Sequence, residues 1–145
     1  MRLYTIGFTL KSAEAFFGAL KRAGVRRLID IRLNNSSQLA GFTKRQDLPY
    51  LLRELCGADY VHVPLLAPTQ ELIDRYRKEK GGLAEFRAAY LRLLNERRVA
   101  DTLDRALLEG PAVLLCAEPE PERCHRSFAA EYLARKWPEL EPVHL

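Results

Sequence analysis

The chain lacks any apolar stretch that approaches the roughly 20 consecutive residues of a membrane span. Residues Met1 and Arg2 lead straight into an apolar run, without the pattern of a signal peptide. Internal repeats, low-complexity tracts and a Pro/Gly/Ser-rich linker are also missing. These absences argue against membrane-spanning, secreted and repeat proteins. We therefore expect a cytoplasmic protein without a membrane partner, folded as a single domain over residues 1–145.

Cysteine is scarce, with only Cys56, Cys116 and Cys124 among 145 residues. An odd number of cysteines in a chain that is 48% hydrophobic does not suit a small secreted disulfide scaffold, so we expect reduced thiols. Long runs of one charge are also absent, because lysine and arginine alternate with aspartate and glutamate. The net charge of +4 permits an anionic ligand but does not by itself indicate nucleic acid.

Short apolar runs alternate with segments of helical periodicity along the chain. The expected strands are residues 3–6, 25–31, 60–63, 112–116 and 143–145. The expected helices are capped by Ser12 and Gly24, by Asp47 and Gly57, and by Thr69 and Gly81, with others near 86–94, 99–107 and 123–136. This alternation predicts an α/β fold with a mostly parallel central sheet of four or five strands and helices on both faces. The strand order is left open.

Polar residues stand where the expected strands end. In open parallel sheets, ligands bind beyond the carboxyl ends of the strands. The strand ends would therefore line one crevice, together with the start of the last helix. The residues concerned are Thr5, Gly7, Asp30, Arg32, His62, Cys116, Glu118, Cys124, His125 and Arg126.

Asp30 and Arg32 are two residues apart on an extended chain, so their side chains share a side. One interpretation is a base or anion clamp held by its neighbour. The other is a structural ion pair that fastens the long polar loop over residues 32–45. The sequence leaves both open.

Cys116 and Glu118 have the same spacing, which would place a thiol beside a carboxylate. A thiolate is nucleophilic, but a neighbouring carboxylate opposes its formation, and a buried cysteine also serves as a small hydrophobe. Cys116, Glu118, Cys124 and His125 are acceptable zinc ligands in type. However, adjacent residues on a helix diverge by about 100°, so we predict no metal site and no cofactor. A redox pair of Cys116 and Cys124 is also disfavoured, since their spacing is not C-x-x-C.

The start of the last helix combines cations with unpaired backbone amides, which together favour an anion. Arg126 and Arg123 would add charged hydrogen bonds, although Arg126 could instead cap carbonyls or pair with Asp30 or Glu118. Cys124 lies in a helical stripe with Phe128 and Tyr132, the pattern of a core thiol.

These residues resemble the family known as domain of unknown function 488. The resemblance runs nearly from end to end, and C-x-E followed by C-H-R, from Cys116 to Arg126, is its most specific part. The other matching segments are Thr5-Ile6-Gly7, Asp30-Ile31-Arg32, Ser36-Ser37, Phe42 and Leu66-Ala67-Pro68-Thr69. The resemblance implies an α/β fold and a shared polar site without an established activity. Many relatives carry a histidine where this chain has Phe8, so a mechanism using that histidine could not operate here.

The leading hypothesis is an enzyme that hydrolyses or cleaves a phosphorylated ligand, such as a nucleotide or a nucleic-acid fragment. Its catalytic residues would be Asp30, Glu118, Cys116 and His125. Its ligand-binding residues would be Arg32, Arg126, Gly7, Thr5 and Cys124. The alternative is a non-catalytic nucleic-acid-binding module whose cations are Arg22, Arg26, Arg27, Lys44 and Arg45. A third interpretation is a purely structural polar network.

Overall fold

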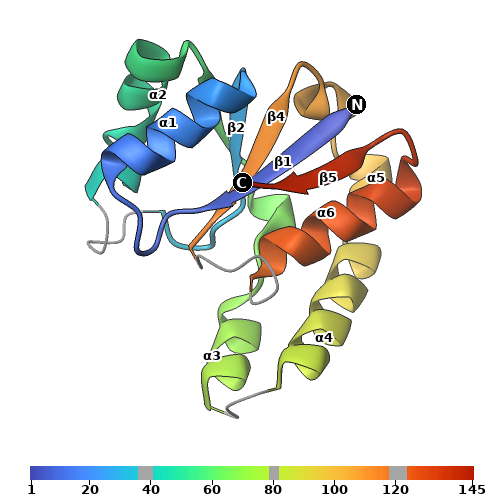
Figure 1. Ribbon diagram of the computed structural model, residues 1–145. Helices are drawn as coiled ribbons and strands as arrows, with labels where there is room; N and C mark the ends of the chain where they lie inside the picture. The colour runs from blue at the N-terminus through green and yellow to red at the C-terminus, as the bar shows by residue number, and fades with distance from the viewer. Residues whose placement is uncertain (36–40, 79–81, 118–123) are drawn as a thin grey trace.

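The computed structural model describes residues 1–35, 41–78, 82–117 and 124–145. They form a five-stranded sheet with helices on both faces (Figure 1). The strand order is β3-β2-β4-β1-β5, and every neighbouring pair is parallel. The strands are β1 (Arg2–Gly7), β2 (Arg27–Asp30), β3 (Asp59–His62), β4 (Ala112–Cys116) and β5 (Glu141–His144). The predicted α/β fold is confirmed.

The helices follow the sequence periodicity with one clear exception. They are α1 (Ala13–Ala23), α2 (Leu48–Cys56), α3 (Gln70–Lys78), α4 (Leu83–Glu96), α5 (Val99–Thr102) and α6 (His125–Lys136). The single helix predicted over 99–107 is wrong, because Leu103 is extended and the Asp104 side chain caps a separate 3-10 turn, Arg105–Leu108. Within the described ranges, no helix has both the length and the apolar character needed to cross a membrane.

The helix starts are fixed by different means. Ser12 and Thr69 accept hydrogen bonds from Ala15 and Leu72, as N-cap residues do, and both predictions are confirmed. Asp47 precedes α2 but has helical backbone angles and no capping hydrogen bond, so its predicted cap is wrong. The helix α6 begins at His125, two residues later than predicted.

Two apolar cores cover the two faces of the sheet, because successive side chains of a strand point to opposite faces. Strand β4 is buried throughout, and its Val113 and Leu115 join the core under α1 and α2. Its Leu114 and Cys116 join the core under α4, α5 and α6. A central parallel strand therefore has hydrophobic neighbours on both sides.

The carboxyl ends of β1 and β4 form a topological switch point. These strands are neighbours, with Gly7 opposite Cys116, yet the chain leaves β1 for α1 on one face and resumes after β4 with α6 on the other (Figure 1). The backbone amides of Phe8 and Thr9 both donate to the Ala117 carbonyl and hold the two exits together. Ligands of open α/β sheets bind at such a point.

Candidate functional site

Thr5, Cys116 and Arg126 meet at the switch point, and each is fully buried. The Arg126 Nε donates to Thr5 Oγ1 at 3.3 Å, and its Nη1 lies 3.8 Å from Cys116 Sγ. Thr5 Oγ1 also lies 2.6 Å from His144 Nδ1 on the neighbouring strand β5. The first three residues were expected to line one crevice, and they lie side by side in the structure. His144, interpreted from the sequence as a core histidine, joins them through the register of β5.

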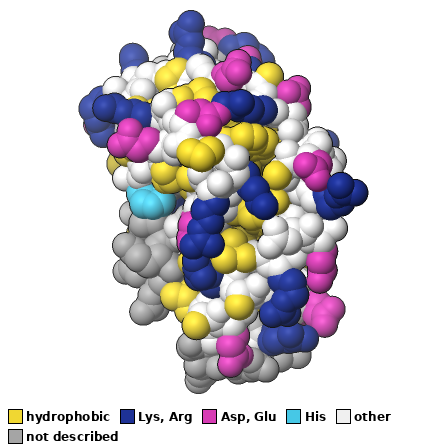
Figure 2. All heavy atoms as spheres, turned by 90° about the vertical axis from the view of Figure 1, so that its right-hand side faces the viewer, with side chains coloured by type: hydrophobic (Ala, Val, Ile, Leu, Met, Phe, Trp, Pro, Cys, Tyr) yellow, Lys and Arg dark blue, Asp and Glu magenta, His cyan; other side chains and the backbone are white. Residues whose placement is uncertain are grey.

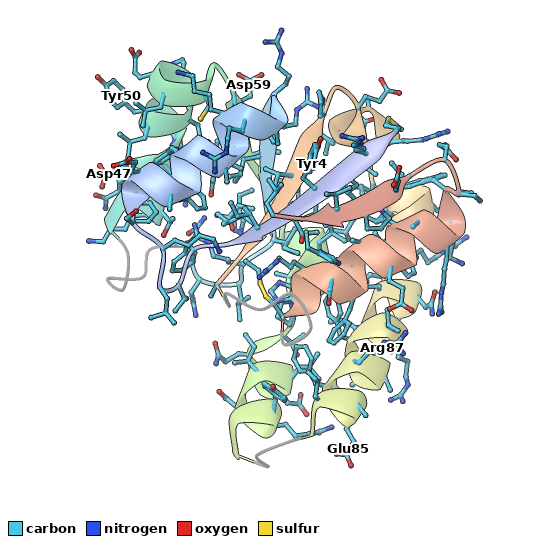
Figure 3. The ribbon with its side chains drawn as sticks, viewed as in Figure 1. Tyr4, Asp47, Tyr50, Asp59, Glu85 and Arg87 are labelled. Carbon is cyan, nitrogen blue, oxygen red and sulfur yellow. A yellow bond between two sulfur atoms is a disulfide. The ribbon has the colours of Figure 1, made fainter. Side chains whose placement is uncertain are left out.

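The sulfurs of Cys116 and Cys124 form a disulfide that joins the end of β4 to the start of α6 (Figure 3). The expectation of reduced thiols is therefore wrong for these two residues, and so is the argument against their pairing. It failed because Cys124, just before α6, lies at the same edge of the sheet as the end of β4, a closeness that sequence spacing does not reveal. Cys56 is a free, partly buried thiol on α2.

His125 is held with a defined proton. Its Nε2 lies 2.8 Å from the Ile31 carbonyl oxygen, which can only accept, so Nε2 carries the hydrogen. Its Nδ1 lies 3.9 Å from Cys124 Sγ. Burial, aided by the charge of Arg126, lowers the pKa of His125 to about 4. The ring is therefore neutral near pH 7, which does not favour the predicted role in proton exchange.

Cys116, Cys124 and His125 bring their ligand atoms within 4.8 Å of one another. The geometric objection to a metal site assumed that Cys124 and His125 are both helical. Cys124 instead stands before the helix in an extended conformation, with φ −126° and ψ 145°. Both side chains therefore reach the sulfur of Cys116, and the objection is wrong.

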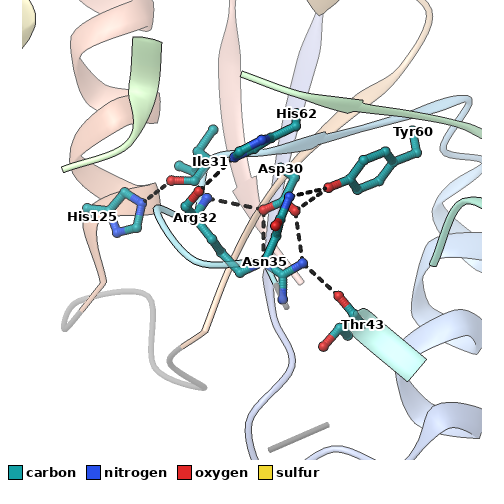
Figure 4. Close-up of polar contacts among 8 residues, drawn as sticks. All are labelled: Asp30, Ile31, Arg32, Asn35, Thr43, Tyr60, His62 and His125. Atoms are coloured by element: carbon teal, nitrogen blue, oxygen red, sulfur yellow. Dashed lines mark hydrogen bonds and ion pairs between the residues drawn. The ribbon is translucent and has the colours of Figure 1, made fainter. Parts of the chain in front are cut away.

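Asp30 and Arg32 form a buried ion pair (Figure 4). The Arg32 Nε and Nη2 each donate to one Asp30 oxygen at 2.8 Å, and the Arg32 amide donates at 3.1 Å. The Tyr60 hydroxyl adds a fourth hydrogen bond at 2.6 Å. Arg32 Nη2 also donates to the Thr43 carbonyl at 2.7 Å, so the pair fastens the loop after β2 to a later turn. This geometry favours the structural interpretation of Asp30.

One nitrogen of the Arg32 guanidinium, Nη1, takes no part in these hydrogen bonds. Arg32 is only 4% exposed, and its Nη1 has no hydrogen-bond acceptor within the described parts of the chain. The guanidinium carbon lies 5.3 Å from the centre of the Phe8 ring, which follows β1. Arg32 thus extends from the end of β2 toward the switch point with a buried donor available.

Tyr60, His62 and Asn35 complete this polar group (Figure 4). Asn35 Nδ2 donates to the Tyr60 hydroxyl at 3.2 Å, and His62 Nε2 lies 2.9 Å from the Arg32 carbonyl oxygen. Burial and the hydrogen bond to Asp30 raise the pKa of Tyr60 to about 12. Sequence reasoning missed Tyr60, although its spacing of two from His62 on one strand was a usable signal.

Two further predicted site residues receive no structural support. Glu118 lies outside the described residues, as do Ser36, Ser37 and Arg123. Gly7 ends β1 opposite Cys116, and its predicted ligand contact stays a prediction.

The cations of the nucleic-acid alternative do not share one surface. Arg22 and Arg26 lie where α1 ends and β2 begins, at the amino edge of the sheet. Arg27 Nη1 is occupied by the carbonyls of residues 106, 107 and 109. Lys44 and Arg45 follow β2 and lie toward the carboxyl edge. On the face shown in Figure 2, cations and anions are interspersed.

A hollow of about 570 Å³ lies along α6 and β5 and is lined by Ser127, Arg135 and His144, among others. His144 connects it to the buried site through Thr5. Neither Cys116 nor Cys124 lines the hollow.

The comparisons with known proteins agree with the resemblance seen in the sequence. The family model described as domain of unknown function DUF488 matches residues 12–133. Of the site residues described above, Thr5, Gly7, Phe8 and His144 lie outside this range. No curated protein and no solved structure matches the chain. Because the family model covers most of its length, the chain belongs to the DUF488 family.

Proposed function

We propose that the chain binds a phosphorylated ligand, such as a nucleotide or a nucleic-acid fragment, at the carboxyl edge of the sheet and cleaves a bond in it. The observation that supports this most directly is Arg32 Nη1, a buried donor without an acceptor in the described residues. A buried donor left unpaired costs about 1–3 kcal/mol, and more for a charged group. A phosphate oxygen of the ligand would accept this hydrogen bond.

The charges around the switch point support an anion. Lys11, on the loop after β1, is partly buried and its ammonium forms no ion pair with the described residues. Burial lowers the pKa of Lys11, and repulsion from Arg126 lowers it further, so the two cations lie within electrostatic reach of each other. An anion between them would relieve this repulsion, and the first turn of α6 adds the positive end of a helix dipole.

The two halves of the site lie within range of one ligand. His125, which directly precedes Arg126, lies 2.8 Å through Nε2 from the carbonyl oxygen of Ile31, the residue between Asp30 and Arg32. Arg32, Lys11 and Arg126 would bind the anion. Asp30 would orient Arg32, because its oxygens already accept four hydrogen bonds. The base for cleavage would be Glu118, whose role a substitution can test directly.

Binding is tested by calorimetry on the oxidised chain with nucleoside phosphates, sugar phosphates and short oligonucleotides at low and high salt. We expect one small phosphorylated compound to bind at both salt concentrations. Lys11→Ala should weaken it about tenfold, the equivalent of 1.4 kcal/mol. Lys21→Ala is the matched control, because Lys21 is exposed near the other end of α1 and should leave affinity unchanged.

Cleavage is tested by incubating the bound compound with the chain and separating the products. Glu118→Gln should abolish turnover while leaving binding and the unfolding midpoint intact. Binding of oligonucleotides alone, lost at high salt and insensitive to Lys11→Ala, would instead support the nucleic-acid-binding module. Binding of none of the compounds would contradict the proposal.

A further inference from the structure

The proposed anion site gives no role to the sulfurs of Cys116 and Cys124 or to Nδ1 of His125. Two thiols and an imidazole are the ligand types that zinc prefers, and three protein ligands leave one of four tetrahedral positions open. The three ligand atoms lie within 4.8 Å of one another. In a tetrahedral zinc site with ordinary bond lengths, ligand atoms stand about 3.5–3.8 Å apart. Small side-chain rotations would therefore suffice to converge on one ion.

His125 is oriented as a metal ligand is. Its Nε2 donates to the Ile31 carbonyl, so Nδ1 of the neutral ring carries the lone pair, and Nδ1 is the nitrogen near Cys124 Sγ. Metal-binding histidines usually fix their other nitrogen by such a hydrogen bond to a backbone carbonyl. The carbonyl of Ile31, the residue after β2, thus selects the His125 tautomer that metal binding through Nδ1 requires.

The sulfur of Cys116 also has an outer partner. Arg126 Nη1 lies 3.8 Å from Cys116 Sγ, and the guanidinium is fully buried. Two thiolates neutralise one Zn²⁺, and a nearby N–H donor stabilises the charge that remains on a bound thiolate. The buried position of the Arg126 guanidinium next to Cys116 Sγ therefore suits a Cys116 thiolate in the reduced chain.

We propose that the reduced chain binds one Zn²⁺ through Cys116 Sγ, Cys124 Sγ and His125 Nδ1, with the fourth position open to water or substrate. The disulfide is the metal-free, oxidised form. A dithiol reductant supplies two electrons and two protons, which break the S–S bond and give two thiols while the reductant becomes a disulfide. Zn²⁺ then displaces the two thiol protons as it binds.

The test is metal binding by the full chain after reduction with a phosphine and removal of metals. Co²⁺ is titrated first, because tetrahedral cobalt with thiolate ligands absorbs visible light, and Zn²⁺ then displaces it. We expect one equivalent per chain and a higher thermal midpoint with Zn²⁺ for the reduced form only. Cys124→Ser and His125→Gln should each weaken binding at least hundredfold.

Cys56→Ser is the matched control, because Cys56 lies on α2 against the opposite core and should leave binding unchanged. If Cys124→Ser fails to fold, His125→Gln decides. Failure of the reduced wild type to bind Co²⁺ or Zn²⁺ overturns the proposal, as does equal binding by wild type and His125→Gln. The proposed anion site is tested on the oxidised chain, so the result of that test does not depend on the result for zinc.

Discussion

Asp30 shows how this chain keeps a charge in its interior. The carboxylate is fully buried at the end of β2, and four donors from Arg32 and Tyr60 satisfy its two oxygens. A buried ion pair contributes little net stability when intact, but removing one partner leaves an uncompensated charge. The loop after β2 therefore depends on this carboxylate for its position.

Asp30→Asn should lower the free energy of unfolding by about 3–5 kcal/mol, because Arg32 would remain buried without its counter-charge. Guanidinium unfolding followed by circular dichroism measures the change. Asp47→Asn is the control, since Asp47 is exposed and makes no capping hydrogen bond, and it should change stability by less than about 0.5 kcal/mol. Equal effects of the two substitutions would contradict the structural role of Asp30.

Tyr60→Phe should lower stability by about 1.5–3 kcal/mol near neutral pH, the cost of a lost hydrogen bond to a charged group. Tyr50→Phe, at a tyrosine that is 58% exposed, is the control and should have little effect. Urea unfolding of both variants and the wild type provides the comparison. A loss of stability shared by both variants would argue against a specific role for the Tyr60 hydroxyl.

The same tyrosine predicts a pH dependence. The fold raises the pKa of Tyr60 to about 12 from an ordinary value of 10.0, so the folded state favours the protonated phenol. Its contribution is fully present below about pH 10 and is lost as the pH rises toward about 12. The wild type should therefore lose more stability over this range than Tyr60→Phe, as urea unfolding at several pH values would show. Parallel curves for the two proteins would refute this.

Part of the site was predictable from residue spacing alone. Asp30 and Arg32 pair because side chains two apart on a strand share a side, and Arg126 lies beside the sheet because it opens a helix at a strand's carboxyl end. The convergence of the Cys124 and His125 ligand atoms near Cys116 Sγ was not predictable in this way. It depends on the helix beginning one residue after Cys124, and helix starts are poorly determined by sequence periodicity.

At the scale of elements, periodicity predicted helices and strands wherever several apolar residues repeated. It failed over 99–107, where apolar residues continue at helical spacing although Leu103 is extended and Asp104 starts a new turn. Asp104 competes for the backbone through its side chain, as aspartate does at helix starts. The strand order was not predictable, because pairing of β4 between β1 and β2 depends on contacts distant in sequence.

Helix α1 carries two glycines whose replacement should have opposite effects. Gly24 ends the helix with φ +69°, so Gly24→Ala should lower stability by about 1 kcal/mol, although no atom of the described residues lies within 4 Å of the added carbon. Gly18 is inside the helix, and an added carbon would meet the movable end of the Arg22 side chain at 3.1 Å. Gly18→Ala should therefore raise stability by up to about 1 kcal/mol. Thermal unfolding of both variants would test the signs, and a shift of both in one direction would contradict this account.

At the scale of the whole molecule, the disulfide is a covalent link between the central strand and the helix that covers one face. Cys116 and Cys124 are eight residues apart, and closing a loop of this size stabilises a fold by about 2–3 kcal/mol in the chain-entropy description. Reduction without metal should therefore lower the free energy of unfolding by this amount. Guanidinium unfolding with a phosphine and a chelator measures it, and Cys56→Ser should show the same loss. A chain whose stability does not respond to reduction would contradict the role of the bond.

The position of β4 also determines when the sheet can be completed during synthesis. Strands β1 and β2 are not neighbours, because β4 lies between them although it follows both by more than 80 residues. Until β4 has emerged from the ribosome, the nascent chain cannot join β1 to the β2–β3 pair, because β4 is the strand between them. It therefore presents the two strand edges that β4 later fills, and both cores lack the side chains that β4 contributes. The ribosome-bound chain would accordingly join β1 to the β2–β3 pair only when residues 112–116 emerge, and β5 (Glu141–His144) would complete the sheet after them.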